Sequence, residues 1–148
     1  MGLFTPVWMK TDFKDFAKGD IYIEKSIKHI DNVTSQEELA MIAKKAPYNK
    51  VYVYAIQRLS DQDLLYDVAG NADNDVARLE AAEKLEDPNK AQEIYTDIAK
   101  KCHEEQYPNP NILIAALEKL NDKNLLRVFV GYRNDDVSTA AKERLSNL

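Results

Sequence analysis

Residues 58–69 read RLSDQDLLYDVA, and residues 119–130 read KLNDKNLLRVFV. The two stretches share the positions of their leucines, of an aspartate and of their apolar ends, which marks them as copies of one structural unit. Further copies appear when the chain is aligned on them. One column of large apolar residues contains Phe13, Leu39, Leu65, Tyr95 and Leu126. Apolar residues follow each member three and four positions later, and this i, i+3, i+4 spacing predicts one buried face of an α-helix.

A second pattern follows each copy of the first, in which a small residue precedes a large apolar residue by four positions. The pairs are Ala55 and Leu59, Ala81 and Leu85, Ala116 and Leu120, and Ala141 and Leu145, with Ser26 and Ile30 as the best fit in the first copy. A small side chain one turn before a large one lets a neighbouring helix approach closely. Each unit is therefore predicted to hold two helices.

Capping residues support these helix positions. Side chains that accept N-terminal amide hydrogen bonds stand where the second helices are expected to begin, at Asp20, Asn49, Asn74, Asn109 and Asn134. Asp61, Asp87 and Asp122 are expected to cap the first helices, and Ser35 with Glu38 matches a capping box. Gly19, Gly70 and Gly131 are expected just past the first helices, in a left-handed conformation.

These patterns predict an all-α protein, a right-handed α-α superhelix of about five helical pairs in one domain, 1–148. A pair of this length cannot bury both of its apolar faces alone, whereas stacked pairs can. We expect an N-terminal cap and first helix over 1–19, closed by Trp8, and central repeats over 20–121 with an insertion near 101–110. The C-terminal repeat is expected over 122–148.

The unit L-x-D-x-x-L-L-x-x-V-A at 59–69, followed by D-V-A-R-L-E-A-A-E-K-L at 75–85, resembles a short HEAT-like repeat. The opening MGLFTPVWM is similar to the start of bacterial HEAT-like repeat proteins. The resemblance is one of architecture, and it implies a binding scaffold, although a few HEAT-like proteins are enzymes. It brings no catalytic motif with it.

Composition narrows the classes of function. The chain has 148 residues, a net charge of −5 and one cysteine, so an internal disulfide is excluded. No apolar run is long enough to span a membrane, and the start lacks the features of a secretion signal, so we expect a cytoplasmic protein. Residues 51–100 carry five Lys/Arg against eleven Asp/Glu, and such an acidic surface argues against binding nucleic acid.

Catalytic patterns are scarce. Glycine-rich phosphate loops are absent, and the acidic pairs stand near helix starts, where they stabilise the helix dipole. Cys102 and His103 are adjacent and would point about 100° apart on a helix, which disfavours a shared metal ion. We therefore predict no enzyme activity, no cofactor and no metal. The alternative is a small-molecule or metal-binding protein, or an enzyme, that uses a crevice near the insertion at 101–110, around Cys102, His103, Glu104 and Tyr107.

A row of basic residues is the main candidate for a binding surface. His29, Arg58, Lys84, Lys119 and Arg144 each precede the large residue that closes a second helix. Cations are favoured there by the helix dipole alone, and the alternative is a basic row that binds a protein or peptide partner. Tyrosines near residue 50 are candidates for the same contact surface. The predicted partner-binding residues are Tyr52, Tyr54, Arg58, Arg78, Lys84 and Lys119. The sequence favours neither a monomer nor a self-assembled form.

Overall fold

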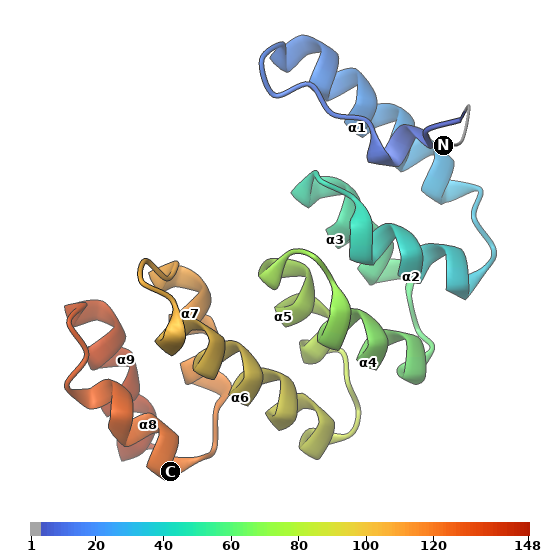
Figure 1. Ribbon diagram of the computed structural model, residues 1–148. Coiled ribbons are helices and arrows are strands. Elements are labelled where there is room, and N and C mark those ends of the chain that lie inside the picture. Colours follow the sequence, from blue (N-terminus) through green and yellow to red (C-terminus); the bar gives the residue numbers. More distant parts are fainter. Residues whose placement is uncertain (1–3) are drawn as a thin grey trace. The chain divides into compact units, whose positions relative to one another are not determined.

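Helices make up the regular structure of the described part of the chain, residues 4–148 of a computed structural model, and no strand occurs there (Figure 1). A 3-10 helix, η1, spans Val7–Met9. Nine α-helices follow in the described residues. They are α1 (Phe16–Asp31), α2 (Gln36–Lys45), α3 (Asn49–Arg58), α4 (Gln62–Asn71), α5 (Asp75–Glu83), α6 (Pro88–Glu104), α7 (Pro110–Lys119), α8 (Lys123–Val130) and α9 (Asp135–Ser146).

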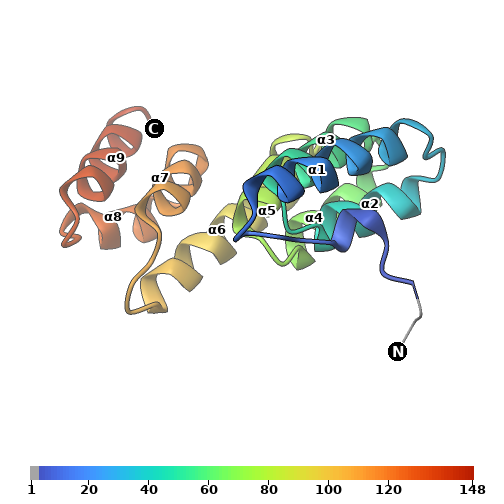
Figure 2. The same ribbon diagram turned by 90° about the horizontal axis from the view of Figure 1, so that it is seen from above.

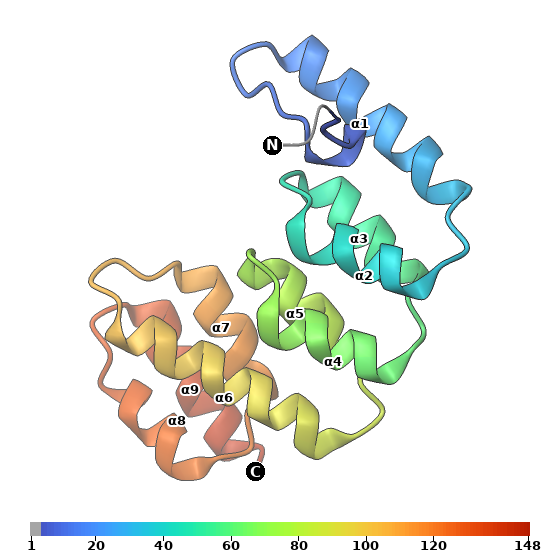
Figure 3. The same cartoon turned by 45° about the vertical axis from the view of Figure 1, so that its right-hand side comes forward.

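The chain divides into two compact units, Met1–Lys84 and Leu85–Leu148. In the first unit α2 packs against α3 and α4 against α5, while α2 contacts α4 and α3 contacts α5 (Figure 3). In the second unit α6 packs against α7, α8 packs against α9, and α7 also contacts α9. The prediction of an all-α chain of packed consecutive pairs, as in an α-solenoid, is confirmed.

The first predicted pair is different. A helix break at Gly19 and Asp20 was expected, but α1 runs through both residues as one sixteen-residue helix. This prediction is wrong because Gly19 is a buried site of close contact inside the helix and not a helix end. The first predicted helix is also absent as such, since Phe13 and Phe16, expected on its buried face, are 62% and 82% exposed. The short η1 precedes them and contacts α1. Its Trp8 is buried, as expected of a capping side chain, while residues 1–3 of the predicted cap lie outside the described residues.

Left-handed glycines were also predicted wrongly, since none of the described glycines has a positive φ. Gly70 lies inside α4, and Gly131 follows α8 with a φ of −98°. The chain instead leaves α2 and α4 in extended backbone, at Ala46 and Ala72. An extended exit suits any residue, so these helix ends need no glycine.

Most of the predicted N-caps are confirmed. Side chains that accept a backbone N–H of the first turn come from Ser35, Asp61, Asn74, Asp87, Asn109, Asp122 and Asn134. Each such cap stabilises its helix by about 1 kcal/mol. Asn49 is an exception, because it is the first residue of α3 and Tyr48 takes the cap position. The capping box is half formed. The Ser35 hydroxyl accepts from the backbone N–H of Glu38, but the Glu38 carboxylate contacts His29 and does not bond back to Ser35.

Glutamines join the helices of three pairs, α2–α3, α4–α5 and α6–α7, in a way that the sequence patterns did not suggest. The Gln36 side chain donates to the carbonyl of Arg58 and accepts from the backbone N–H groups of Ser60 and Asp61. Gln62 donates to the carbonyl of Lys84 in the same manner. In the second unit Gln92 donates to the carbonyl of Lys119 and accepts from the N–H of Asn121. A side chain of the first helix thus satisfies backbone groups that the end of the second helix leaves unpaired.

Substitution of the two helical glycines, Gly19 near the start of α1 and Gly70 next to the last residue of α4, by alanine should change stability in opposite directions. A Cβ at Gly19 would lie 2.9 Å from Tyr48 Oη and 3.0 Å from the carbonyl oxygen of Asp12, whereas one at Gly70 meets nothing within 4 Å. We expect Gly70→Ala to stabilise by about 0.5–1 kcal/mol, because alanine loses less conformational freedom in a helix. Gly19→Ala should destabilise by about 1 kcal/mol, because the crowding outweighs that gain. Urea unfolding of both variants checks this, and two changes of the same sign would contradict it.

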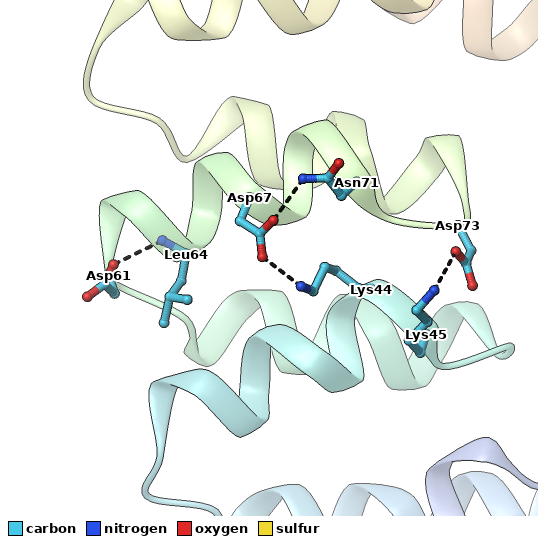
Figure 4. Close-up of polar contacts among 7 residues, drawn as sticks. All are labelled: Lys44, Lys45, Asp61, Leu64, Asp67, Asn71 and Asp73. Carbon is cyan, nitrogen blue, oxygen red and sulfur yellow. Dashed lines mark hydrogen bonds and ion pairs between the residues drawn. The ribbon is translucent and has the colours of Figure 1, made fainter.

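An ion pair joins the first helices of neighbouring pairs. Lys44 Nζ of α2 lies 2.6 Å from Asp67 Oδ2 of α4, and Asn71 donates to the other oxygen of the same carboxylate (Figure 4). Lys45 lies 3.0 Å from Asp73 in the loop after α4. The hydrogen bond from Lys44 lowers the pKa of Asp67 below its ordinary value, against an opposing effect of partial burial. The pair therefore orients α4 against α2.

The Lys44–Asp67 pair should make stability depend on pH in the acidic range. Since the pKa of Asp67 is lower in the folded chain than its ordinary 3.8, the stabilisation is complete at neutral pH. It is lost as the pH falls through 3.8 towards the folded value. We expect the difference in unfolding free energy between the parent and Asp67→Asn to shrink over that range. In a Lys44→Met background the difference should become smaller and vary less with pH, and an unchanged profile there would contradict the assignment.

Candidate functional site

The predicted basic row is placed at the ends of the second helices, where it serves contacts within the fold. Arg58 Nη1 lies 3.5 Å from Asp31 at the end of α1, and its guanidinium carbon lies 5.6 Å from the ring centre of Tyr54. The Tyr54 hydroxyl donates to Asp31 as well, and this bond raises the pKa of Tyr54. The structure thus brings Tyr54 and Arg58 together around an acidic partner of their own chain.

Lys84 and Arg144 continue this arrangement. The Lys84 ammonium donates to the carbonyls of Ile56, Gln57 and Leu59 at the end of α3, at 2.7, 3.1 and 2.6 Å, and burial lowers the pKa of Lys84. Arg144 Nε donates to the carbonyl of Leu120 at 2.8 Å, just past α7. Lys84 and Arg144 therefore bind the negative ends of preceding second helices, whereas Arg58 and His29 of the same row meet the carboxylates of Asp31 and Glu38.

Tyr52 and Arg78 do not reach the surface. Tyr52 is 2% exposed, and its hydroxyl bonds with Asn49 and Asn74, while burial raises its pKa. Arg78 is also buried, and its Nε donates to the carbonyl of Ala69 at 2.8 Å. Their placement in a contact surface is corrected, because both side chains join helices of the core. Lys119 is exposed on α7 of the second unit, and its backbone carbonyl accepts from Gln92.

An apolar groove beside η1 is the main candidate site in the described part of the first unit. It has a volume of about 630 Å³. Its lining comes from the N-terminal segment, from the end of α1 and from α2, and consists of Phe4, Pro6, Val7, Trp8, His29, Glu38 and Met41. Phe4 is 91% exposed and Met41 is 54% exposed. Figure 2 shows η1 on the side of α1 where α2 lies.

Exposed apolar side chains concentrate around this end of the first unit. Among the described residues, nine large apolar side chains are exposed, and six of them lie at or before residue 41. The six are Phe4, Met9, Phe13, Phe16, Ile21 and Met41. Of these six, Phe4 and Met41 line the groove, and apolar side chains that share one exposed surface mark contact sites more often than single ones do.

Contacts of Tyr48 hold the N-terminal segment next to the groove. The Tyr48 hydroxyl accepts from the backbone N–H of Asp12 at 2.9 Å, and the Phe13 ring centre lies 5.2 Å from that of Tyr48. The Asp12 carboxylate accepts from the N–H groups of Asp15 and Lys14, and these bonds lower its pKa, led by the bond from Asp15. The turn before α1 is therefore fixed on both sides.

One polar pair stands at the edge of the apolar lining. His29 Nε2 lies 2.9 Å from Glu38 Oε1, and about two fifths of each side chain is exposed. The carboxylate keeps acceptor capacity beyond this contact, because it can take about four hydrogen bonds. The groove thus combines a large apolar surface with one carboxylate, and it holds no arrangement of nucleophile and base.

The predicted crevice near the insertion exists in part. A cavity of about 300 Å³ in the second unit is lined by His103, Glu105, Gln106, Tyr132 and Arg133. The Arg133 guanidinium donates to the carbonyl of Gln106, and the His103 ring packs edge-on against Phe129. Cys102 is buried and Glu104 and Tyr107 are absent from the lining. No group of three potential metal ligands occurs among residues 4–148.

Sequence reasoning missed the groove, although one signal was available. Met41 stands two residues after the column residue Leu39, at the position that Asp67 and Asp97 occupy in later copies. Val128 is also apolar at this position, so Met41 alone was a weak signal of an exposed surface. Phe4 and Pro6 precede the repeats, so no periodic pattern could place them.

Within the described residues, none of the helices is long and apolar enough to cross a membrane. Comparison with family models, with curated proteins and with solved structures gives no match to this chain.

Proposed function

We propose that the protein is a non-catalytic scaffold of the cytoplasm that binds a protein or peptide, and that the groove beside η1 is its binding surface. The observation that carries the proposal is the exposure of Phe4 and Met41 over a groove of about 630 Å³. Burial of apolar area is the main source of affinity in protein association, at roughly 25 cal/mol per Å² before the costs of ordering.

The groove is a better candidate than the row of cations on the second helices. Lys84 and Arg144 donate to backbone carbonyls, and a partner would have to break these bonds before it could use either charge. Tyr54 and Arg58 are more accessible, but they already meet Asp31. A ligand-binding role for the crevice around His103 stays a prediction.

Replacing Met41 should weaken binding. Val128 of α8 provides a matched control, because it stands two residues after Leu126 as Met41 stands two after Leu39, and the two are 47% and 54% exposed. We expect Met41→Asp to raise the Kd for the natural partner at least about tenfold, equivalent to about 1.4 kcal/mol. Val128→Asp should leave it within about twofold, because Val128 does not line the groove beside η1.

The partner itself can be trapped at the groove. A photoreactive benzoylphenylalanine in place of Met41, and separately in place of Val128, would be activated in living cells. We expect a discrete cross-linked product from position 41 that position 128 does not give, and the protein identified in it would then be purified for calorimetry. Identical products from the two positions, or a Kd that Met41→Asp does not change, would contradict the proposal.

A further inference from the structure

The groove continues the layer of first helices. Asp67 of α4 meets Lys44 of α2, so this position in a first helix faces the preceding first helix (Figure 4). The equivalent residue of α2 is Met41, which lines the groove and not a helix interface. The interface between α4 and α2 therefore has a continuation on the far side of α2, at the place where η1 supplies only Val7–Met9.

Three residues of η1 cover this position incompletely. Ile23 and Ile27 of α1 are half-buried, whereas their equivalents in α3, Tyr52 and Ile56, are 2% and 1% exposed. The difference arises because α3 has a complete first helix, α2, packed against it and α1 does not. A further helix packed against α1 and α2 would cover more of both.

The side chains in the groove reverse the pattern of the α2–α4 interface. Where α4 has Asp67, α2 has the apolar Met41, and where α4 has Leu64, α2 has the acidic Glu38. A helix in the groove therefore needs an apolar residue at the position where α2 has Lys44. One turn earlier it needs a lysine or arginine, which can reach the Glu38 carboxylate beside His29.

We infer that the groove binds an amphipathic α-helix of another protein, which takes the place of a first helix against α1 and α2. This inference rests on the proposed function and specifies its partner. The helix carries apolar residues at i, i+3 and i+4 spacing, which would pack into the groove, and one basic residue on the same face. Its basic residue also suits a chain whose net charge is −5.

A pair of stapled peptides tests the inference. Both copy residues 34–47, with the staple joining positions 41 and 45 on the outer face, because an isolated helix of this length is marginal in water. The first peptide carries Ala40→Lys and Lys44→Leu, and the second keeps the parent residues. Trp8 is the only tryptophan of the chain and lines the groove, so its emission reports occupancy directly.

The substituted peptide should shift the Trp8 emission saturably and bind at least tenfold more tightly than the parent copy. Met41→Asp should abolish the shift, and Val128→Asp should preserve it. Equal binding of the two peptides, or the lack of a saturable shift with the substituted one, would overturn the inference. So would a concentration-dependent dimer in sedimentation that Met41→Asp abolishes and Val128→Asp retains, because the occupant would then be a second copy. If neither peptide binds while cross-linking at position 41 yields a partner, the inferred helix is wrong and the proposed function stands. If the cross-linking also yields no partner, the proposed function is wrong as well.

Discussion

Phe129→Ala should unfold much of the second unit under conditions in which the parent is stable. The Phe129 ring is 0% exposed, and its centre lies 5.6 Å from that of His103 and 5.4 Å from that of Tyr132. Phe129 and Leu126 are the two buried side chains of α8, which has only eight residues. Truncating a fully buried phenylalanine costs about 3–5 kcal/mol, because contacts are lost and a cavity remains. A unit of this size is stabilised by roughly 3–10 kcal/mol in total.

Amide hydrogen exchange, followed in peptides from each unit, measures this effect where it arises. We expect protection to fall across α8 and α9, together with a lower midpoint of urea unfolding. Val128→Ala is the matched control, because the neighbouring side chain is 47% exposed and its truncation should change stability by less than about 0.5 kcal/mol. A midpoint shift no larger for Phe129→Ala than for Val128→Ala would contradict the assigned core.

Lys84→Met should destabilise the first unit by about 2–3 kcal/mol. The substitution keeps the apolar stem but removes an ammonium that bonds three carbonyls at the end of α3. The carbonyls of Ile56 and Leu59 then lose a charged donor in a partly buried place, and the end of α3 should fray. Thermal unfolding and amide exchange in residues 49–60 report the two effects.

Two variants show whether the loss of stability comes from the bonds of Lys84 to the carbonyls or from the loss of any positive charge. Lys84→Arg should retain much of the stability, because Arg144 makes the equivalent bond to the carbonyl of Leu120 in the second unit. Lys45→Met removes an exposed ion pair with Asp73 and should cost less than about 0.5 kcal/mol. Equal losses for Lys84→Met and Lys45→Met would show that the carbonyl contacts contribute little.

The helical pairs could be predicted because their signals are local. Apolar columns such as Leu39, Leu65 and Leu126 have a helical period, and caps such as Asp61 and Asp122 act within one turn. The long α1 could not be predicted in the same way. Gly19 lies inside α1 at a place that Tyr48 approaches from another part of the chain, and such a contact has no local signal in the sequence.

The candidate site was predictable only in part, for a related reason. Lys84 and Arg144 were recognised as one row, but their ligands are carbonyls, and backbone atoms have no sequence signature. Arg78 and Tyr52 were assigned to a surface by residue type. Both side chains are buried, and Arg78 donates to the carbonyl of Ala69. The groove is lined by Phe4 and Met41, which are far apart in the sequence, so no local pattern could bring them together.

The burial of Cys102 in α6 has a practical consequence for labelling chemistry. This thiol is the only one in the chain and is 2% exposed, so maleimides should react with it slowly. A cysteine introduced at an exposed position such as 41 or 128 would then take a fluorophore or spin probe selectively, in the otherwise native protein. Mobility or polarity at either position could be followed over time without first removing a residue from the core.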